Sequence, residues 1–444
     1  MRFICDFHIH SKYSRATSRQ MEPETLAYWA AIKGINVLGA GDFTHPAWVK
    51  ELKEKLEPAE KGLYKLKDPN FKPKENSEFG VSRQSLEKAR FVLTAEISSI
   101  YSKAGKVRRA HNVIFAPDFE TVEKINSKLE QIGNLKSDGR PILGLDAKEL
   151  LKIILSVSPA AVMVPAHAWT PWFSVFGSKS GFDSLEECFD DYAKYIFAIE
   201  TGLSSDPGMN WRLSALDKIT LISNSDAHSP ANLGREANVF EGESIDYYSI
   251  MSALKNKGHS DTTKTAPLKF SYTIEFFPEE GKYHYDGHRL CNVSMGPEET
   301  KKAKGVCPVC RKPLTIGVMY RVEELADRPV GGKPERVIPY KNLIPLEEII
   351  ADALGLGKIS KATRAEYVKL ICALGSEFNI LLDAPIEEIA KHSEPIIAEG
   401  VKRTREQKAK VVPGFDGEYG KIKIFEESER EKFKEEKKER QKLF

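Results

Sequence analysis

Short apolar runs alternate with helix-like stretches over roughly the first 260 residues of the chain. The helix-like stretches, in which apolar residues recur every three or four positions, cover residues 24–33, 119–132 and 147–156. The apolar runs are seven, at residues 3–7, 35–40, 91–95, 112–116, 161–164, 196–199 and 219–223. This alternation predicts an α/β fold of parallel strands joined by crossover helices. Seven strands over this length favour a barrel of the (β/α) type over an open sheet.

The pattern changes after the barrel. Residues 260–275 look like a linker, and the stretch that follows carries Cys and His with few helical signals. Helical periodicity returns in the region after this stretch and ends in a basic segment. The last residues predict a single, highly charged helix with acids and bases three or four positions apart. The expected divisions are a barrel at 1–260, a zinc-binding module at 276–320, a helical DNA-binding region at 339–412 and a charged tail at 426–444.

Composition narrows the class of protein. The chain has 444 residues, 41% apolar and 29% charged, which is typical of soluble globular proteins. Lys+Arg 66 nearly balance Asp+Glu 64, so any nucleic-acid surface must be a local patch. No apolar run reaches the length of a membrane span, and the start has no secretory pattern, so we expect a cytoplasmic protein. Sparse Gln and abundant Lys and Glu resemble a heat-adapted, thermophile composition.

Metal-binding side chains follow the predicted strands, one set after another. These residues are His8, His10, Asp42, His45, Glu96, His111, His167, Glu200, Asp226 and His228. In a parallel barrel the strand ends meet at one mouth, where active sites are built. On an extended strand, residues two apart point to the same side, so the His-x-His pair faces one ion. The sequence therefore predicts a multinuclear metal site.

The mixed ligand set indicates which ions and which chemistry to expect. Imidazole and carboxylate together suit Zn²⁺, Mn²⁺ or Fe²⁺ better than Mg²⁺ or Ca²⁺. A carboxylate such as Glu96 has one oxygen for each of two ions. Two ions about 3.5–4 Å apart can hold a hydroxide that attacks a phosphoester in line.

A second cluster predicts a structural zinc site. His288-x-x-Cys291 and Cys307-x-x-Cys310 are separated by 15 residues, the arrangement of two zinc knuckles. His284 lies four positions before His288 and could replace it. Such a closed site stabilises a small module and performs no reaction.

Several motifs resemble the PHP family of metallophosphoesterases. They are Asp-Phe-His-Ile-His-Ser at 6–11, Glu96 after an apolar strand, Pro-Ala-His at 165–167 and Ser-Asp-Ala-His at 225–228. The resemblance implies a distorted (β/α)7 barrel that cleaves phosphoesters with two or three metal ions.

A narrower resemblance covers nearly the whole chain. The segments 41–46, 199–206 and 413–417, together with the Cys/His cluster, are similar to the archaeal endonuclease Q family. That family consists of DNA repair endonucleases that cut 5′ of a deaminated base (uracil, hypoxanthine or xanthine) or at an abasic site. The resemblance implies a metal-dependent endodeoxyribonuclease, located in the cytoplasm with the nucleoid.

The resemblance also implies ligand assignments. His8, His10, Glu96 and Asp226 would bind a first ion, and Glu96, His111 and His167 a second. His228 with Asp42 or His45 would bind a third, although Phe43 stands where the family usually has His. The catalytic set would be His8, His10, Glu96, His167 and Asp226, and Glu200 would be a ligand, a base or a DNA contact. The expected cofactors are two or three Zn, Mn or Mg ions in the barrel and one structural Zn in the module.

Reading a damaged base requires that it leave the stack and enter a pocket. Candidate DNA contacts near the metal motifs are aromatic or basic: Tyr13, Arg15, Arg19, Arg108, Arg109, Trp169, Trp172, Glu200 and Trp211. The basic residues 402–410 are further candidates for phosphate contacts. Residues 441–444 resemble a truncated sliding-clamp peptide, which makes a sliding clamp a second expected partner beside damaged DNA.

Two alternatives share parts of this pattern. A small-molecule phosphatase of the histidinol-phosphate type would have the barrel and the metals but would not need the zinc module or the helical region. A DNA-binding accessory protein with a degraded metal site would bind lesions without turnover.

Overall fold

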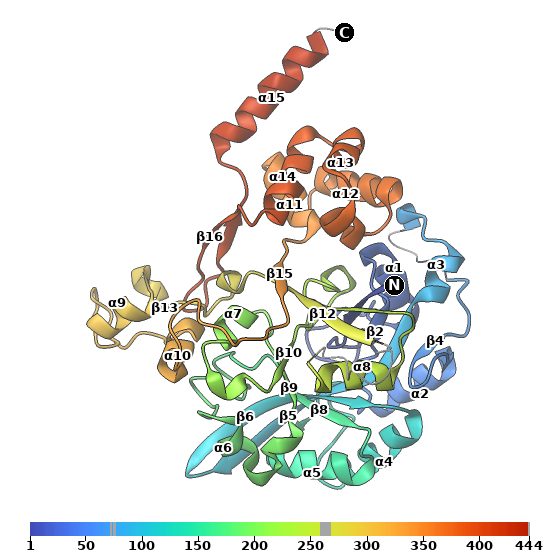
Figure 1. Cartoon of the computed structure of the whole chain (residues 1–444), viewed down its shortest axis with the longest axis vertical. Coiled ribbons are helices and arrows are strands. Elements are labelled where there is room, and N and C mark those ends of the chain that lie inside the picture. Colours follow the sequence, from blue (N-terminus) through green and yellow to red (C-terminus); the bar gives the residue numbers. More distant parts are fainter. Residues whose placement is uncertain (72, 74–76, 258–267, 443–444) are drawn as a thin grey trace.

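The protein was analysed as a computed structural model, which describes residues 1–71, 73, 77–257 and 268–442. Figure 1 shows an α/β body at the bottom and a cluster of helices above it. The segment with α9 and β13 lies at one side, and the last helix extends away from the rest. The fold class expected from the sequence, mixed α/β, is confirmed.

All seven predicted strands are present. They are β1 (Arg2–Asp6), β2 (Val37–Gly39), β5 (Arg90–Lys103), β6 (Lys106–Ala116), β8 (Val162–Pro165), β9 (Ala198–Glu200) and β10 (Thr220–Ile222). β1, β2 and β5 pair in parallel, as do β9 and β10. The predicted helices are α1 (Pro23–Lys33), α4 (Phe119–Leu129) and α5 (Ala147–Val157).

The fourth strand departs from the prediction of a wholly parallel arrangement. β6 runs antiparallel to both β5 and β8. A tight turn joins it to β5, with Ala104 and Gly105 both at positive φ, and this leaves no room for a crossover helix. The first residues of β6 therefore lie beside the C-terminal end of β5. The first half of β6 borders the mouth.

Other elements extend the body. Near the start they are α2 (Pro46–Lys55), β3 (Leu56–Pro58), β4 (Tyr64–Leu66), α3 (Arg83–Lys88) and β7 (Ile142–Leu143). Further along they are α6 (Leu185–Phe189), α7 (Pro207–Asn210), β11 (Ala237–Gly242), α8 (Tyr247–Lys255) and β12 (Leu268–Glu275).

One apolar cluster receives side chains from all seven strands and from α8. Its fully buried members include Phe7, Phe115, Val164 and Phe240, with the Phe7 and Phe115 rings packed edge to face at 5.7 Å. Burying one such side chain contributes roughly 1.5–3 kcal/mol. The cluster is a rigid support for the strand ends beside it.

The predicted linker at 260–275 is wrong in its second half. Residues 268–275 form β12, which pairs with β11 on one side and with β15 (Tyr340–Asn342) on the other. The last three residues of this strand are buried, so it belongs to the body of the protein. The first half of the predicted linker lies largely outside the described residues.

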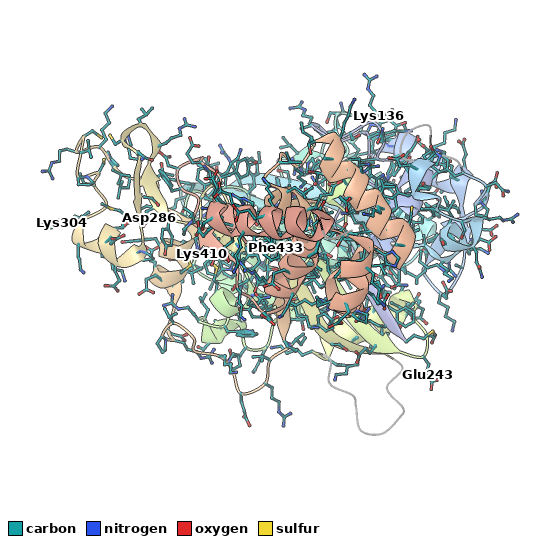
Figure 2. All side chains as sticks on the ribbon, turned by 90° about the horizontal axis from the view of Figure 1, so that it is seen from above. Lys136, Glu243, Asp286, Lys304, Lys410 and Phe433 are labelled. Atoms are coloured by element: carbon teal, nitrogen blue, oxygen red, sulfur yellow. The ribbon has the colours of Figure 1, made fainter. Side chains whose placement is uncertain are left out.

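The Cys/His segment is built of short elements. They are β13 (Asp286–His288), β14 (Val293–Met295), α9 (Pro297–Lys302) and α10 (Val318–Leu325). Figure 2 shows Asp286 and Lys304 in a lobe well separated from Lys136 and Glu243.

The helical region docks on the body through a buried ion pair. The ammonium of Lys33, at the end of α1, donates to Glu377 at 2.6 Å, and the Tyr367 hydroxyl donates to the same carboxylate at 2.5 Å. The helices of this region are α11 (Leu346–Leu354), α12 (Lys361–Leu374), a π-helix (Asn379–Asp383), α13 (Ile386–His392) and α14 (Pro395–Arg405).

The chain ends in a hairpin and a long helix. β16 (Lys410–Val412) pairs with β17 (Lys421–Lys423), and α15 (Glu427–Lys442) follows, which agrees with the single helix predicted for the tail. The sliding-clamp peptide at 441–444 lies partly outside the described residues and stays a prediction from the sequence. Among the helices that are described, none combines the length and the apolar character that a membrane crossing needs.

Candidate metal centre

Two imidazoles converge just beyond the end of β1. His8 and His10 are 2% and 0% exposed and lie on the same side of the extended chain. His8 Nε2 lies 3.5 Å from Glu96 Oε2 and 3.8 Å from Asp226 Oδ1. His10 Nε2 lies 3.2 Å and 3.0 Å from the same two oxygens. These four side chains form a group whose donor atoms all lie within 4.8 Å of one another.

A second group shares one of its members with the first. Glu96 Oε1 lies 2.7 Å from His111 Nδ1 and 3.0 Å from His167 Nε2, while Oε2 faces His8 and His10. His111 comes from β6, opposite Ser98 of β5, and His167 follows β8. One carboxylate thus presents one oxygen to each group, which is the arrangement of a bridging ligand.

Two buried carboxylates fix the orientation of the first pair of imidazoles. Nδ1 of His8 lies 3.0 Å from Glu200, and Nδ1 of His10 lies 3.0 Å from Asp42. A carboxylate on one ring nitrogen holds the imidazole in place and leaves the other nitrogen free to bind a metal. Glu200 and Asp42 therefore each contact the Nδ1 side of an imidazole, opposite the nitrogen that faces the metal group.

The backbone at the strand ends is strained where the candidate ligands are presented. Asp42, His167 and Asp226 have φ of 51°, 29° and 47°. Residues other than glycine seldom adopt positive φ, and such positions gather at functional sites. Beneath His167, Gly202 approaches so closely that an added Cβ would lie 2.5 Å from that of His167.

The donor atoms of the first group fit a divalent cation. His8 Nε2, His10 Nε2 and Asp226 Oδ1 are buried and form no hydrogen bond. Buried polar atoms without a partner are costly, so three that converge on one point indicate a ligand of opposite polarity. Two imidazole nitrogens and two carboxylate oxygens suit Zn²⁺ or Mn²⁺.

Burial and the neighbouring carboxylates act in opposite directions on the pKa values of the centre. Burial alone would lower the pKa of His8, but Glu200 and Glu96 outweigh it and raise that pKa well above its ordinary value. Burial raises the pKa of Asp226, yet the neighbouring imidazoles of His10 and His8 lower it overall. Burial lowers the pKa of His111 to about 4, so this imidazole stays neutral, as a metal ligand must be.

The residues predicted for a third ion do not form a comparable group among the described residues. Asp42 Oδ2 accepts hydrogen bonds from the Ser11 amide and hydroxyl, so the carboxylate is fully used in support. The His45 ring stacks on Tyr13 at 4.4 Å. His228 lies beside His10, 4.5 Å between rings, with Nδ1 2.9 Å from the Asp226 carbonyl oxygen. Asp42 thus lies behind His10, and the third ion stays a prediction from the sequence.

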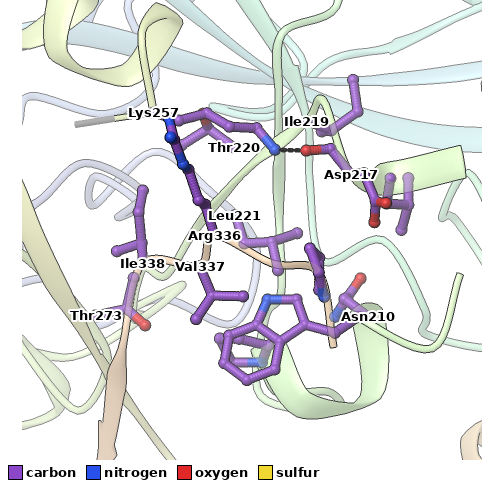
Figure 3. A pocket seen from close by; sticks show the side chains of 14 residues that line it. Asn210, Asp217, Ile219, Thr220, Leu221, Lys257, Thr273, Arg336, Val337 and Ile338 are labelled. Atoms are coloured by element: carbon purple, nitrogen blue, oxygen red, sulfur yellow. Dashed lines mark hydrogen bonds between the residues drawn. The ribbon is translucent and has the colours of Figure 1, made fainter. Parts of the chain in front are cut away.

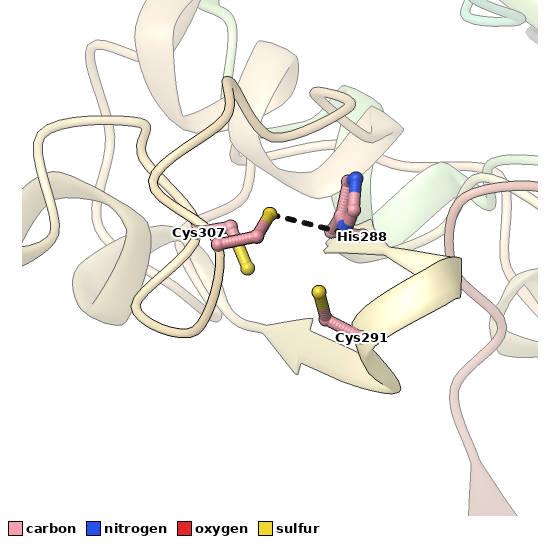
Figure 4. Close-up of side chains that lie close together, drawn as sticks. His288, Cys291 and Cys307 are labelled. Atoms are coloured by element: carbon pink, nitrogen blue, oxygen red, sulfur yellow. Dashed lines mark hydrogen bonds between the residues drawn. The ribbon is translucent and has the colours of Figure 1, made fainter.

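The four residues of the predicted zinc site lie together. His288, Cys291, Cys307 and Cys310 form one group, with Cys310 Sγ 3.7 Å from His288 Nδ1 (Figure 4). Three thiols and one imidazole suit tetrahedral Zn²⁺. His284, the alternative to His288, lies outside the group and stacks on Tyr285.

The predicted aromatic contacts to DNA fall into different environments. Trp169 is 1% exposed and donates its indole N–H to Asn210, so it belongs to the core and is not available as a surface contact. Trp172 is exposed and packs against Tyr283 near the Cys/His segment. Trp211 lines a separate pocket near Lys257, whose ammonium donates to the Asp217 carbonyl (Figure 3).

The predicted basic contacts also differ. Arg15 and Arg19 are exposed at the rim beside the first metal motif. Arg108 and Arg109 pack over the rings of Phe182 and Phe173. In the basic stretch at 402–410, Arg403 pairs with Glu399 and Glu429, and Arg405 donates to carbonyl groups at the end of the π-helix. Both arginines thus make contacts within the helical region and its C-terminal extension.

Sequence reasoning missed Arg140. The guanidinium of Arg140 donates to Glu96 Oε2 at 3.0 Å. It precedes β7 in a loop without any motif, so only the folded chain brings it to the centre.

One family model and two curated relatives match parts of the chain. A family model described as the MJ0043 C-terminal domain matches residues 345–408. Protein MJ0043 of Methanocaldococcus jannaschii is 34% identical over 58% of this chain, and the match spans 31% of that relative's length. YqxK of Bacillus subtilis is 28% identical over 88% of this chain and 89% of its own.

Two solved structures resemble the chain over almost its full length. The lesion-specific endonuclease PfuEndoQ from Pyrococcus furiosus has a TM-score of 0.80 and 33% identity, covering 96% of both chains. Endonuclease Q in complex with a 27-mer duplex carrying an abasic lesion at its active site has a TM-score of 0.79 and 34% identity, covering 96% of this chain and 98% of that one.

An α/β body with imidazoles and carboxylates converging from successive strand ends defines a protein with a candidate dinuclear metal centre. The chain belongs to the endonuclease Q family. This confirms the resemblance drawn from the sequence motifs.

Proposed function

We propose that this protein is a metal-dependent DNA repair endonuclease that hydrolyses the phosphodiester 5′ of a deaminated base (uracil, hypoxanthine or xanthine) or of an abasic site. Its likeness to a lesion-specific endonuclease and to an enzyme solved with an abasic lesion at its active site supports this proposal. The reaction takes place at the mouth of a distorted (β/α)7 barrel.

The observation that carries the proposal is the position of Glu96 between two sets of donors. Its two oxygens face His8 and His10 on one side and His111 and His167 on the other. Two divalent cations bound there supply a nucleophile at neutral pH and stabilise the charge that develops on the phosphoryl oxygens. Asp226 completes the first set, while Glu200 and Asp42 hold the imidazoles in place.

The remaining parts of the chain would bind DNA. The damaged nucleotide leaves the stack to reach the buried centre, at a cost that is lowest for a mismatched or abasic site. The Cys/His module holds one structural Zn²⁺ and presents a surface to the duplex beside Trp172, and the helical region gives a second surface. Such an enzyme works in the cytoplasm at the nucleoid.

Cleavage of end-labelled duplexes tests the proposal. Duplexes carry uracil, hypoxanthine, xanthine, an abasic site or no lesion, and each is incubated with Mn²⁺, Mg²⁺ or Zn²⁺ and with chelator. We expect metal-dependent nicking 5′ of the lesion that leaves a 3′-hydroxyl and a 5′-phosphate, and none on the undamaged duplex.

Two variants serve as controls. His8→Ala removes a candidate ligand and abolishes nicking, while Glu186→Gln changes an exposed residue of α6 that lies outside the metal groups and leaves nicking intact. Hydrolysis of histidinol phosphate or p-nitrophenyl phosphate without nicking would instead favour a small-molecule phosphatase. Lesion binding without turnover in any metal would favour an accessory protein.

A further inference from the structure

We propose that Arg140 and the Ser98 hydroxyl form a phosphate-binding subsite that holds the non-bridging oxygens of the scissile phosphate. This inference rests on the proposed function, because it deepens the role of the same mouth. Arg140 and Ser98 would bind the phosphate anion, while the imidazoles and carboxylates of the centre bind the metal ions.

The guanidinium of Arg140 lies between the buried centre and solvent. It donates one hydrogen bond, at 3.0 Å, to Glu96 Oε2, and its side chain is 29% exposed. Within the part of the chain that the structure describes, the remaining N–H groups of this guanidinium meet no other acceptor. The planar fork of an arginine matches the oxygens of a phosphate in a bidentate way.

The loop that carries Arg140 is fitted against the first metal motif. The Gly139 amide donates to the Tyr13 carbonyl at 3.0 Å, and the Thr44 hydroxyl donates to the Gly139 carbonyl at 3.1 Å. A Cβ at Gly139 would lie 2.3 Å from the carboxylate of Asp42, so only glycine permits this approach. The position of Arg140 is therefore built into the fold and is not a chance contact of a surface loop.

Ser98 supplies a second, independent indication of a ligand. It lies on β5 two residues beyond Glu96, hence on the same face, and directly opposite His111 on β6. It is 1% exposed, and its hydroxyl has no hydrogen-bond partner. Its amide donates to the Pro141 carbonyl at 3.0 Å, which places this strand beside the Arg140 loop. A buried, unpartnered hydroxyl on the strand that pairs with the segment following Arg140 suits an anionic oxygen.

A simpler role for Arg140 would be to neutralise Glu96. In that case its removal would weaken metal binding, and a higher metal concentration would restore activity. If Arg140 binds phosphate, metal content stays the same and the loss appears in kcat and in phosphate affinity. The two roles therefore differ in a measurable way.

The kinetic test compares Arg140→Ala and Arg140→Lys with a matched control, Arg83→Ala, an exposed arginine of α3 paired with Glu87. On an abasic duplex at saturating Mn²⁺ we expect Arg140→Ala to lower kcat roughly 100-fold, with metal content by mass spectrometry unchanged. Arg140→Lys restores part of the rate, because it keeps the charge but not the fork, which also shows that the fold survives. Recovery of Arg140→Ala to near wild-type rates at high Mn²⁺, or loss of its metal, would overturn the proposal.

The binding test does not depend on DNA cleavage. Calorimetric titration of the Mn²⁺-loaded protein with inorganic phosphate should give a Kd that is at least roughly 10-fold weaker in Arg140→Ala, weaker in Ser98→Ala and unchanged in Arg83→Ala. If the wild-type protein cuts no lesion duplex, the proposed function fails, yet this titration still decides on the subsite. Equal phosphate affinity in wild type and Arg140→Ala, or no binding by either, refutes it.

Discussion

Both carboxylate oxygens of Glu200 lie 3.0 Å from Nδ1 of His8, at a depth where neither side chain is more than 2% exposed. The same carboxylate accepts the His167 amide at 2.8 Å and the side-chain amide of Asn224 at 2.9 Å. One acid thus supports a histidine of each metal group. From the sequence its role is open between ligand, base and DNA contact, and these contacts favour a positioning role.

Glu200→Gln should weaken metal binding more than it changes the fold. The new amide N–H₂ group must face either the His167 amide or the Asn224 amide, both of which are donors, and the His8 imidazole loses its charged partner. We expect the Mn²⁺ concentration for half-maximal cleavage to rise roughly 10–100-fold. Glu186→Gln, on the exposed side of α6, is the matched control. An unchanged metal requirement would show that Glu200 does not orient His8.

Glu96→Gln should abolish catalysis while DNA binding persists. An amide cannot bridge two cations as a carboxylate does, so both metal groups lose a ligand. Cleavage of an abasic duplex should fall by at least roughly 10³-fold, which corresponds to about 4 kcal/mol of transition-state stabilisation. Gel-shift affinity for the same duplex should stay within about threefold. If Glu96→Gln keeps substantial turnover, the bridging role is wrong.

The Cys/His lobe is connected to the metal mouth through Arg321 of α10. This guanidinium, 8% exposed, donates to the carbonyl groups of Phe176 and Phe182 at 3.0 Å and 3.1 Å. Both carbonyls belong to the loop that begins after His167. The lobe therefore contacts the loop that follows a candidate metal ligand.

Cys307→Ser should therefore affect both zinc content and cleavage. We expect the protein to lose one tightly bound Zn²⁺, to melt at a lower temperature in calorimetry and to cut lesion DNA more slowly. Structural zinc sites contribute directly to folding free energy, so the loss is not confined to the lobe. Cys372→Ser changes an exposed thiol outside the cluster and is the control. Full zinc content in Cys307→Ser would refute the assignment of the site.

The Lys33–Glu377 pair should make stability depend on acid pH. Burial alone would raise the pKa of Glu377, but Lys33 and the hydrogen bond from Tyr367 lower it below its ordinary value. A carboxyl whose pKa is depressed by folding stabilises the folded state above its unfolded pKa, about 4.3, and loses that contribution as pH falls through the folded pKa. The free energy of unfolding should thus fall more steeply below about pH 4.3 in wild type than in Glu377→Gln.

Lys33→Met gives a second measure of the same pair. It leaves Glu377 charged and buried without its partner, at a cost of roughly 3–5 kcal/mol. The double variant Lys33→Met/Glu377→Gln should recover part of that loss, because no buried charge remains. Equal stability of Lys33→Met and the double variant at neutral pH would show that the pair is not coupled.

The sequence by itself determined those site residues whose positions follow from local spacing along the chain. His8 and His10 share a face because they lie two apart on an extended segment, and Glu96 follows a buried strand. Cys307 and Cys310 are spaced as one zinc knuckle. Local periodicity and spacing suffice for such positions, since the geometry of a strand or a turn fixes the direction of each side chain.

Only the tertiary structure decided what stands behind and beside these residues. Asp42 and Glu200 occur in the same pattern of acids as Asp226, yet they lie behind the imidazoles, because contacts between distant strands set their orientation. Trp169 is buried although its neighbourhood suggested a surface. Arg140 reaches the centre from a loop with no motif, through contacts made by residues 40 to 130 positions away in the sequence. Separations of that size are closed only by packing of the whole fold, which no local pattern encodes.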